Sequence, residues 1–171
     1  MLTHTLRTVH QIMKGYISRP TVSPEKAIVI PFRCWPIDCD IYFHMNNSKY
    51  LATAELARWR TLPPSDMLSR TLSKEGLLFI AAENKVKYIR PINPMQKYVI
   101  STTVTVDSED KWFYYKHSFL EHPDDAKGKQ KSFAIVDLKA VVKKKNGKTI
   151  KPSVLIEDSK FYQEWVTKKP E

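Results

Sequence analysis

Apolar residues recur every three or four positions over the first eighteen residues, which is the spacing of one face of an α-helix. A proline-containing segment over residues 19–24 follows and predicts a short linker. Residues 46–60 also predict a helix, because they contain no glycine or proline and end shortly before two successive prolines. Alanines along one side of this helix would let a sheet approach it closely. Residues 65–74 predict one more short helix.

The rest of the chain is rich in β-branched and aromatic residues, which favour strands. Strands are predicted over residues 27–32, 77–90, 99–106, 112–120 and 133–142. Asn146 and Gly147 form a two-residue hairpin signal, so a last short strand is expected over residues 148–151. Residues 157–168 predict a terminal helix. A helix early in the chain followed by antiparallel strands is an α+β order, unlike alternating βαβ units.

A chain of 171 residues that is 42% hydrophobic has the size and composition of one folded domain. We therefore expect a single domain with a C-terminal helix over residues 25–171, preceded by an amphipathic basic helix and linker over residues 1–24. The four glycines are too scattered for a GxxxxGK or GxGxxG phosphate loop, and there is no GxSxG motif. These absences argue against nucleotide chemistry on such loops and against a serine α/β-hydrolase.

Chemically active side chains gather just before and at the start of the helix predicted over residues 46–60. Two aspartates, a histidine and two asparagines occur within ten residues, namely Asp38, Asp40, His44, Asn46 and Asn47. An asparagine at a helix start can cap one of the amides that open the helix unpaired. The same amides and the helix dipole stabilise negative charge. An acidic residue beside such a helix end suits attack on a carbonyl.

The run D-C-D-x-x-x-H-M-N-N-x-x-Y-L over residues 38–51 resembles the signature of the hot-dog-fold acyl thioesterases. Within that fold it is similar to the 4-hydroxybenzoyl-CoA thioesterase-like group, nearest the branch called thioesterase superfamily member six. A Tyr-Ile-Arg-Pro run over residues 88–91 extends the resemblance, which covers roughly residues 26 to 145.

The resemblance implies an α+β hot-dog fold, in which a curved antiparallel sheet wraps around a central helix. It also implies an acyl-CoA thioesterase that hydrolyses an acyl thioester to the free acid and coenzyme A, with no cofactor and no metal. Family members place the site where two subunits meet with their sheets joined edge to edge. A homodimer, or a dimer of dimers, is therefore expected. The alternative is a non-catalytic acyl-CoA or lipid-binding hot-dog protein.

The resemblance assigns the catalytic roles. Asp40 matches the catalytic aspartate, which acts as nucleophile or as the base for a water, while the alternative is a loop aspartate that accepts from loop amides. The Asn47 amide matches the main oxyanion donor. His44 is suited to proton transfer near neutral pH or to fixing the loop through a hydrogen bond. Asn46 and Asn47 are each either a helix cap or part of the site, with Asn46 assigned to substrate binding.

Further substrate-binding candidates surround these groups. Phe43 stands where many relatives have glycine, so we expect its ring to narrow the pocket. Tyr42 occupies the position of an asparagine used by the related plant acyl-carrier-protein thioesterases, so their mechanism does not transfer whole. Arg90 is a candidate for the phosphates of coenzyme A, with solvent exposure as the alternative. On the predicted helix, Glu55 is expected to be an exposed or interface carboxylate, and Arg58 is expected to pack and pair rather than react.

The net charge of +10 suits three kinds of partner: nucleic acid, an anionic membrane surface, or a phosphorylated molecule such as coenzyme A. A solvated basic face is the alternative. No aromatic or zinc pattern of a nucleic-acid-binding protein occurs in the chain, so no nucleic-acid partner is expected.

Cys34 and Cys39 are five positions apart, and His44 is five further on. This spacing is a weak metal signal, so we expect no metal, reduced thiols and a reducing compartment. No apolar run reaches the ~20 residues that span a bilayer. The basic N-terminal helix, which has no acidic residue before Glu25, suits a mitochondrial transit peptide, a membrane-surface helix or a docking helix. A cytoplasmic or mitochondrial location is expected, and secretion is not.

Overall fold

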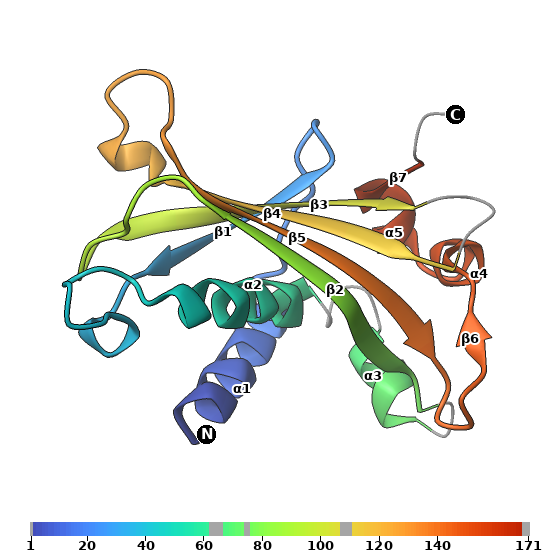
Figure 1. Cartoon of the computed structure of the whole chain (residues 1–171). Coiled ribbons are helices and arrows are strands. Elements are labelled where there is room, and N and C mark those ends of the chain that lie inside the picture. The colour runs from blue at the N-terminus through green and yellow to red at the C-terminus, as the bar shows by residue number, and fades with distance from the viewer. Residues whose placement is uncertain (1, 62–66, 74–75, 107–110, 169–171) are drawn as a thin grey trace.

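The body of the molecule is one curved antiparallel sheet that wraps around helix α2 (Asn47–Thr61), as Figure 1 shows. The computed structural model describes residues 2–61, 67–73, 76–106 and 111–168. The main strands lie in the order β1-β3-β4-β5-β2. This is the α+β architecture of a curved sheet around a central helix that the motif predicts.

The elements follow the sequence patterns closely. The strands are β1 (Ala27–Arg33), β2 (Leu78–Tyr88), β3 (Lys97–Val106), β4 (Phe113–Glu121), β5 (Ser132–Lys143), β6 (Thr149–Ile150) and β7 (Val166–Lys168). The other helices are α1 (Leu2–Ile17), α3 (Met67–Leu72), α4 (Pro152–Glu157) and α5 (Lys160–Trp165), with short 3₁₀ turns η1 (Pro36–Asp38) and η2 (Pro123–Asp125). Part of the helix predicted over residues 65–74 lies outside the described residues.

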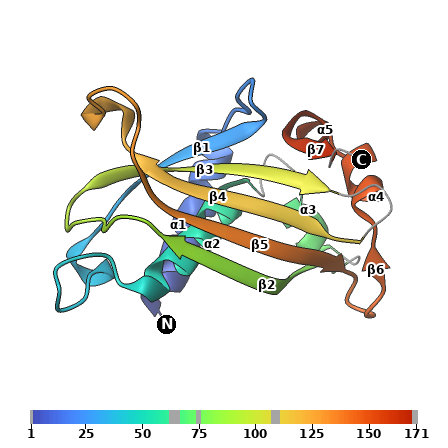
Figure 2. The same cartoon turned by 45° about the horizontal axis from the view of Figure 1, so that its top comes forward.

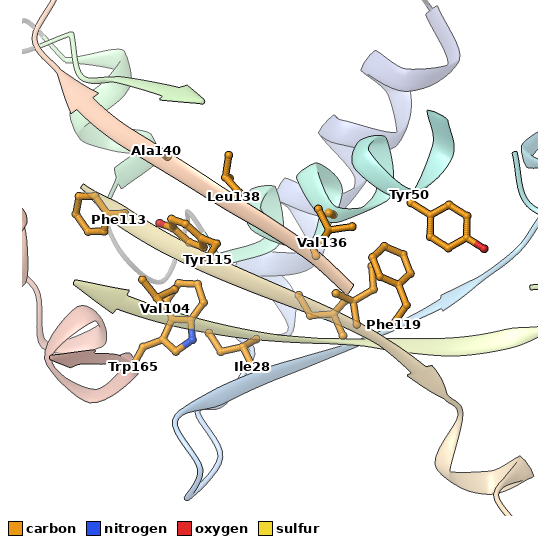
Figure 3. Packing of buried hydrophobic residues seen from close by; sticks show 14 of the residues in the cluster. Ile28, Tyr50, Val104, Phe113, Tyr115, Phe119, Val136, Leu138, Ala140 and Trp165 are labelled. Carbon is orange, nitrogen blue, oxygen red and sulfur yellow. The ribbon is translucent and has the colours of Figure 1, made fainter. Parts of the chain in front are cut away.

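The core lies on the concave face of the sheet, because every second side chain of β3, β4 and β5 points there. Cross-strand pairing puts Phe119 of β4 between Ile100 of β3 and Ala134 of β5. Figure 3 shows the cluster reaching from Tyr50 of α2 to Trp165 of α5. Each large side chain buried in this way contributes about 1.5–3 kcal/mol to folding.

Helix α2 meets the sheet through small side chains, as its alanine pattern predicts. Ala54 and Ala57 are fully buried and belong to the sheet-side core. Leu56 is also buried but lies outside that core. Helix α1 packs against α2, and Figure 2 shows both helices on the same side of the sheet.

The two edges of the sheet differ in how they are covered. β1 pairs with β3 only as far as Thr103, and β7 pairs in parallel with β3 from Val104 onward. β2 pairs with β5, and nearly all of its side chains are exposed. Among the described residues, β2 has no partner strand on its outer side.

The C-terminal prediction is wrong in part. Residues 157–168 are not one helix: α4 ends at Glu157, α5 ends at Trp165, and β7 follows. α5 packs on the end of the sheet through Trp165, whose indole Nε1 donates to the Thr102 carbonyl at 3.2 Å. The chain then pairs with the part of β3 that β1 leaves open. Pairing with the open edge of β3 therefore overrides the local helical pattern at residues 166–168.

Candidate functional site

The candidate site is built on the loop that joins β1 to α2. After the 3₁₀ turn η1, the loop doubles back as a narrow antiparallel ribbon. The Asp40 amide donates to the His44 carbonyl at 3.1 Å, and the Asn46 amide donates to the Asp38 carbonyl at 2.9 Å. These bonds join the two sides of the ribbon, and the second one ties the Asp38 backbone to the residue that precedes α2.

The Asp40 carboxylate lies near the tip of this ribbon, with its side chain 23% exposed. Its Oδ1 accepts a hydrogen bond from the Tyr42 amide at 3.0 Å and lies 3.7 Å from His44 Nδ1. One carboxylate oxygen therefore has the usual role of a loop aspartate. The other oxygen, Oδ2, has no hydrogen bond to any residue that the structure describes. A carboxylate that is anchored through one oxygen can use its second oxygen to attack a carbonyl carbon or to accept a proton.

Asp38 has a structural role. Its side chain is 1% exposed, and its Oδ1 accepts from Arg7 Nη1 at 2.6 Å. Lys49 Nζ lies 3.8 Å away, and the Trp35 amide donates to Oδ2 at 3.4 Å. A buried carboxylate needs such partners. The link from Arg7 pins α1 to the loop, and no pattern within the sequence pairs these two residues.

Only one of the two asparagines caps the helix in the structure. Asn46 is the cap, because its Oδ1 accepts from the Ser48 amide at 3.0 Å and from the Ser48 hydroxyl at 2.7 Å. Such a cap stabilises the helix by about 1 kcal/mol. Asn47 is the first residue of α2, and its amide has no hydrogen-bond partner among the described residues. Its carbonyl accepts from the Tyr88 hydroxyl at 3.2 Å, which ties the end of β2 to the helix start.

The tip of the ribbon is aromatic and exposed. Phe43 has a φ of +57°, a left-handed conformation that glycine adopts most easily, and its side chain is 76% exposed. The backbone thus explains why glycine suits this position. The Tyr42 ring is also exposed and stacks on the His44 ring at a centroid distance of 6.0 Å. Contact of Phe43 or Tyr42 with substrate stays a prediction.

Arg90 follows β2 on the same side of the molecule as the start of α2, because Tyr88 reaches Asn47. Its amide donates to the Phe133 carbonyl at 3.0 Å, and its side chain is exposed. Exposure leaves the guanidinium accessible to an anionic group, and its use for coenzyme A stays a prediction.

The two cysteines are free thiols whose Sγ atoms lie 3.5 Å apart. Burial and, secondarily, the hydrogen bond with Cys39 raise the pKa of Cys34 to about 12. Cys34 is therefore protonated at neutral pH. Within residues 2–61, 67–73, 76–106 and 111–168, no three His, Cys, Asp or Glu side chains gather as metal ligands.

A cavity of about 560 Å³ lies between α2 and the concave face of the sheet. Its walls are Leu51, Ala52, Glu55, Arg58, Trp59 and Thr61 of α2, Thr71 of α3, Leu77, Leu78, Phe79, Ala81 and Asn84 at and before β2, and Tyr115, Val136 and Tyr162. Neither Asp40 nor Asn47 lines it. The cavity begins at the second turn of α2, so in a single chain it does not include Asp40 or the Asn47 amide.

A buried polar group beside this cavity is not indicated by any motif in the sequence. Arg58 Nη1 lies 3.0 Å from Nε2 of His117, which is fully buried, and His117 Nδ1 lies 2.9 Å from the Thr102 hydroxyl. A guanidinium can only donate, so Nε2 accepts and the imidazole proton sits on Nδ1. The available signal was a histidine at an inward position of a strand, between Tyr115 and Phe119.

Two curated proteins are similar to this chain. A probable thioesterase of Saccharomyces cerevisiae, YBR096W, is 29% identical over 133 residues, which are 78% of this chain and 55% of the yeast protein. The protein THEM6 of Xenopus laevis is 31% identical over 90 residues, which are 53% of this chain and 42% of that protein. The chain thus spans about half the length of the curated relatives it matches.

Solved structures share the fold. YbaW, a probable thioesterase from Escherichia coli, is similar with a TM-score of 0.67 and 20% identity, covering 81% of this chain and 98% of that chain. A mutant 4-hydroxybenzoyl CoA thioesterase complexed with 4-hydroxybenzoyl CoA has a TM-score of 0.63 and 17% identity, covering 77% of this chain and 97% of that one. The predicted hot-dog fold is confirmed.

The family model of the thioesterase-like superfamily matches residues 34–159. That range includes the loop with Asp40, helix α2 and strands β2 to β6. The motif, the fold and the family model agree, and the chain belongs to the thioesterase-like superfamily.

Proposed function

We propose that this protein is an acyl-CoA thioesterase in which Asp40 and the Asn47 amide act on one thioester carbonyl. The observation that carries the proposal is the loop geometry. Hydrogen bonds across the ribbon fix the loop that carries Asp40, and this loop leads into a helix start whose first amide has no partner among the described residues. A negative charge is stabilised at that helix end.

In the proposed reaction, the thioester carbonyl oxygen accepts from the Asn47 amide. Asp40 attacks the carbonyl carbon, or takes a proton from a water that attacks it, and the developing oxyanion stays at the amide. The C–S bond then breaks and coenzyme A leaves as the thiolate. If Asp40 has attacked, water hydrolyses the resulting anhydride and restores the carboxylate. His44 Nδ1 lies 3.7 Å from Asp40 Oδ1 and orients the carboxylate. The His44 ring also stacks on the Tyr42 ring and orients that side chain.

The net charge of the chain and a solved structure with the same fold both support coenzyme A as the carrier of the acyl group. The chain has a net charge of +10, and the exposed Arg90 lies on the side where β2 reaches the helix start. Such a surface attracts a polyphosphorylated ligand. A solved structure with the same fold, 4-hydroxybenzoyl CoA thioesterase, holds a coenzyme A thioester.

We further propose that the working unit is a homodimer. The outer edge of β2 carries the exposed apolar residues Leu78 and Ile80, and the loop tip exposes Ile41, Tyr42 and Phe43. Apolar side chains on an uncovered strand edge are a template for a second copy. A partner there would cover the tip and complete a pocket over Asp40, which the single chain does not enclose.

Contact with a membrane surface through α1 is also proposed. Along this helix the apolar residues Leu6, Val9, Met13, Tyr16 and Ile17 are exposed, while Arg7 and Gln11 face inward. An amphipathic helix with an exposed apolar stripe in a basic segment suits an anionic lipid surface. Among the described residues, no helix has the length and hydropathy needed to cross a bilayer.

The experiment that tests the proposed activity is a panel of acyl-CoA thioesters assayed for release of free thiol. Asp40→Asn should lower kcat by about a hundredfold or more, because the amide can neither attack nor take a proton. Asp137→Asn, an exposed aspartate on β5, is the matched control and should retain full turnover. Circular dichroism of each variant reports the fold.

Unchanged turnover in Asp40→Asn would remove the catalytic assignment. Acyl-CoA binding by calorimetry without any thiol release from the wild-type protein would select a non-catalytic binding protein instead.

A further inference from the structure

The cavity beside α2 is long, with mostly apolar walls. It extends from Leu51 in the second turn of α2 to Thr61 at the end of the helix. Leu77 and Phe79 form the opposite wall, and Tyr162 of α5 closes the far end. Residues of the sheet and of α2 thus line a cavity that lies further along α2 than the helix start where we place the thioester.

Arg58 places a positive charge at the far end of this apolar cavity. Its guanidinium is partly buried, and Nη1 donates a hydrogen bond to His117. His117 accepts that bond and is neutral, because burial and, secondarily, the Arg58 charge depress its pKa well below the usual value. No carboxylate of the described residues lies within 4.0 Å of Arg58. The charge is hydrogen-bonded, and the Glu55 carboxylate acts on it only from beyond ion-pair distance, which is unusual for a partly buried cation.

Glu55, the acidic residue on the cavity wall, is engaged elsewhere. Its Oε1 accepts from the Trp59 indole at 3.2 Å, and its Oε2 lies 3.8 Å from His4 of α1. These contacts direct the carboxylate toward the α1 side of α2. Thr71 and Tyr162 line the same end of the cavity as hydroxyl-bearing side chains.

We propose that the cavity receives the acyl chain of the substrate and that Arg58 binds a carboxylate at the far end of that chain. The preferred substrates are then coenzyme A half-thioesters of medium-chain dicarboxylic acids. The inference rests on the proposed function and names the substrate class of that same site. Arg58 is the specificity-determining residue and takes no part in bond breaking.

The length of the helix supports this assignment. Asn47 and Arg58 are eleven positions apart, so they are separated by about 16 Å along the helix axis. A thioester carbonyl at the Asn47 amide therefore reaches Arg58 with a chain of medium length. A methyl end at the same depth would leave the Arg58 charge desolvated and without an anion, whereas a carboxylate forms a charge-assisted pair with it.

The test compares dodecanoyl-CoA with the coenzyme A half-thioester of dodecanedioic acid. The wild-type protein should prefer the dicarboxylic substrate in kcat/KM by about tenfold to a hundredfold. Arg58→Gln keeps an amide donor for His117 and removes the charge, so the ratio of kcat/KM between the two substrates should fall to about one. Arg60→Gln, two residues further along α2 and outside the cavity wall, is the matched control and should keep the preference.

A binding measurement separates this inference from the proposed catalysis. Trp59 lines the cavity, so its fluorescence reports occupancy without any turnover. Dodecanamide and its ω-carboxyl counterpart, the monoamide of dodecanedioic acid, differ only at the far end. The ω-carboxyl compound should bind at least about tenfold tighter to the wild-type protein and to Arg60→Gln, but not to Arg58→Gln. The response should vanish in Trp59→Phe.

Equal use of the two thioesters by an active enzyme, or a preference that survives in Arg58→Gln, overturns the assignment of Arg58. Absence of all hydrolysis removes the proposed function, and the fluorescence comparison then tests by itself whether Arg58 binds a carboxylate in the cavity. Equal binding of the two amides to the wild-type protein refutes that role of Arg58.

Discussion

At the scale of single residues, His117 shows how burial sets a chemical state. It is fully buried, hydrogen-bonded on both ring nitrogens, and neighboured by the Arg58 cation. Burial is the larger cause of its depressed pKa, and the Arg58 charge is the second. The folded protein therefore keeps His117 neutral at pH values where the unfolded chain binds a proton.

This state predicts acid sensitivity of the fold. A base with a depressed folded pKa contributes stability above its unfolded pKa of about 6.5, and that stability is lost as the pH falls below it. Urea unfolding should show the free energy of unfolding falling between pH 6.5 and 5 by up to about 1.4 kcal/mol per pH unit from this residue. His117→Gln, which keeps hydrogen-bonding groups without a titrating ring, should flatten the dependence. The same slope in both proteins would contradict the assignment.

At the scale of elements, α1 has two different faces. One face is tied to the loop by the 2.6 Å contact of Arg7 with the buried Asp38, so the helix docks where the ribbon that carries Asp40 begins. The other face presents apolar residues to solvent, among them Val9 and Met13. A helix that only docked on the domain would not need an exposed apolar stripe.

This exposed face predicts membrane binding. The protein should float with vesicles that contain phosphatidylserine, and the bound fraction should fall as salt increases. Met13→Glu changes an exposed side chain, so it should reduce flotation several-fold while leaving the thermal unfolding midpoint nearly unchanged. Leu72→Glu, at an exposed apolar residue of α3, is the control and should float like the wild-type protein. Equal flotation of the two variants would argue against α1 as the contact.

At the scale of the whole molecule, the two edges of the sheet differ in how far the chain itself covers them. β7 covers the part of β3 that β1 leaves open, so that edge is partly closed within the chain. β2 at the opposite edge exposes Leu78, Ile80 and the adjoining Ile89. An apolar open edge is expected to be covered by a second copy.

The dimer can be tested by size-exclusion chromatography with light scattering. The wild-type protein should have twice the chain mass of 19.9 kDa. Ile80→Lys should shift the population toward monomer and lower thioester hydrolysis together with it, because a charge is placed on the edge that we assign to the interface. Val29→Lys changes a residue of similar exposure on β1 and should remain dimeric. A monomeric wild-type protein, or dissociation caused only by Val29→Lys, would contradict the proposed interface.

The sequence by itself determined the order of the main helices and strands as far as β6, the capped start of α2 and the superfamily. These features are local: periodicity, a capping asparagine and a short motif each depend on residues close together in the chain. Only the tertiary structure decided that Asn46 is the cap, that Asp38 is held by Arg7, and that the last residues form β7. It also decided the pairing of Arg58 with His117, because those residues are 59 positions apart and meet only when β4 curves over α2. Contacts of that separation carry no local signature, since they are set by packing around a shared core.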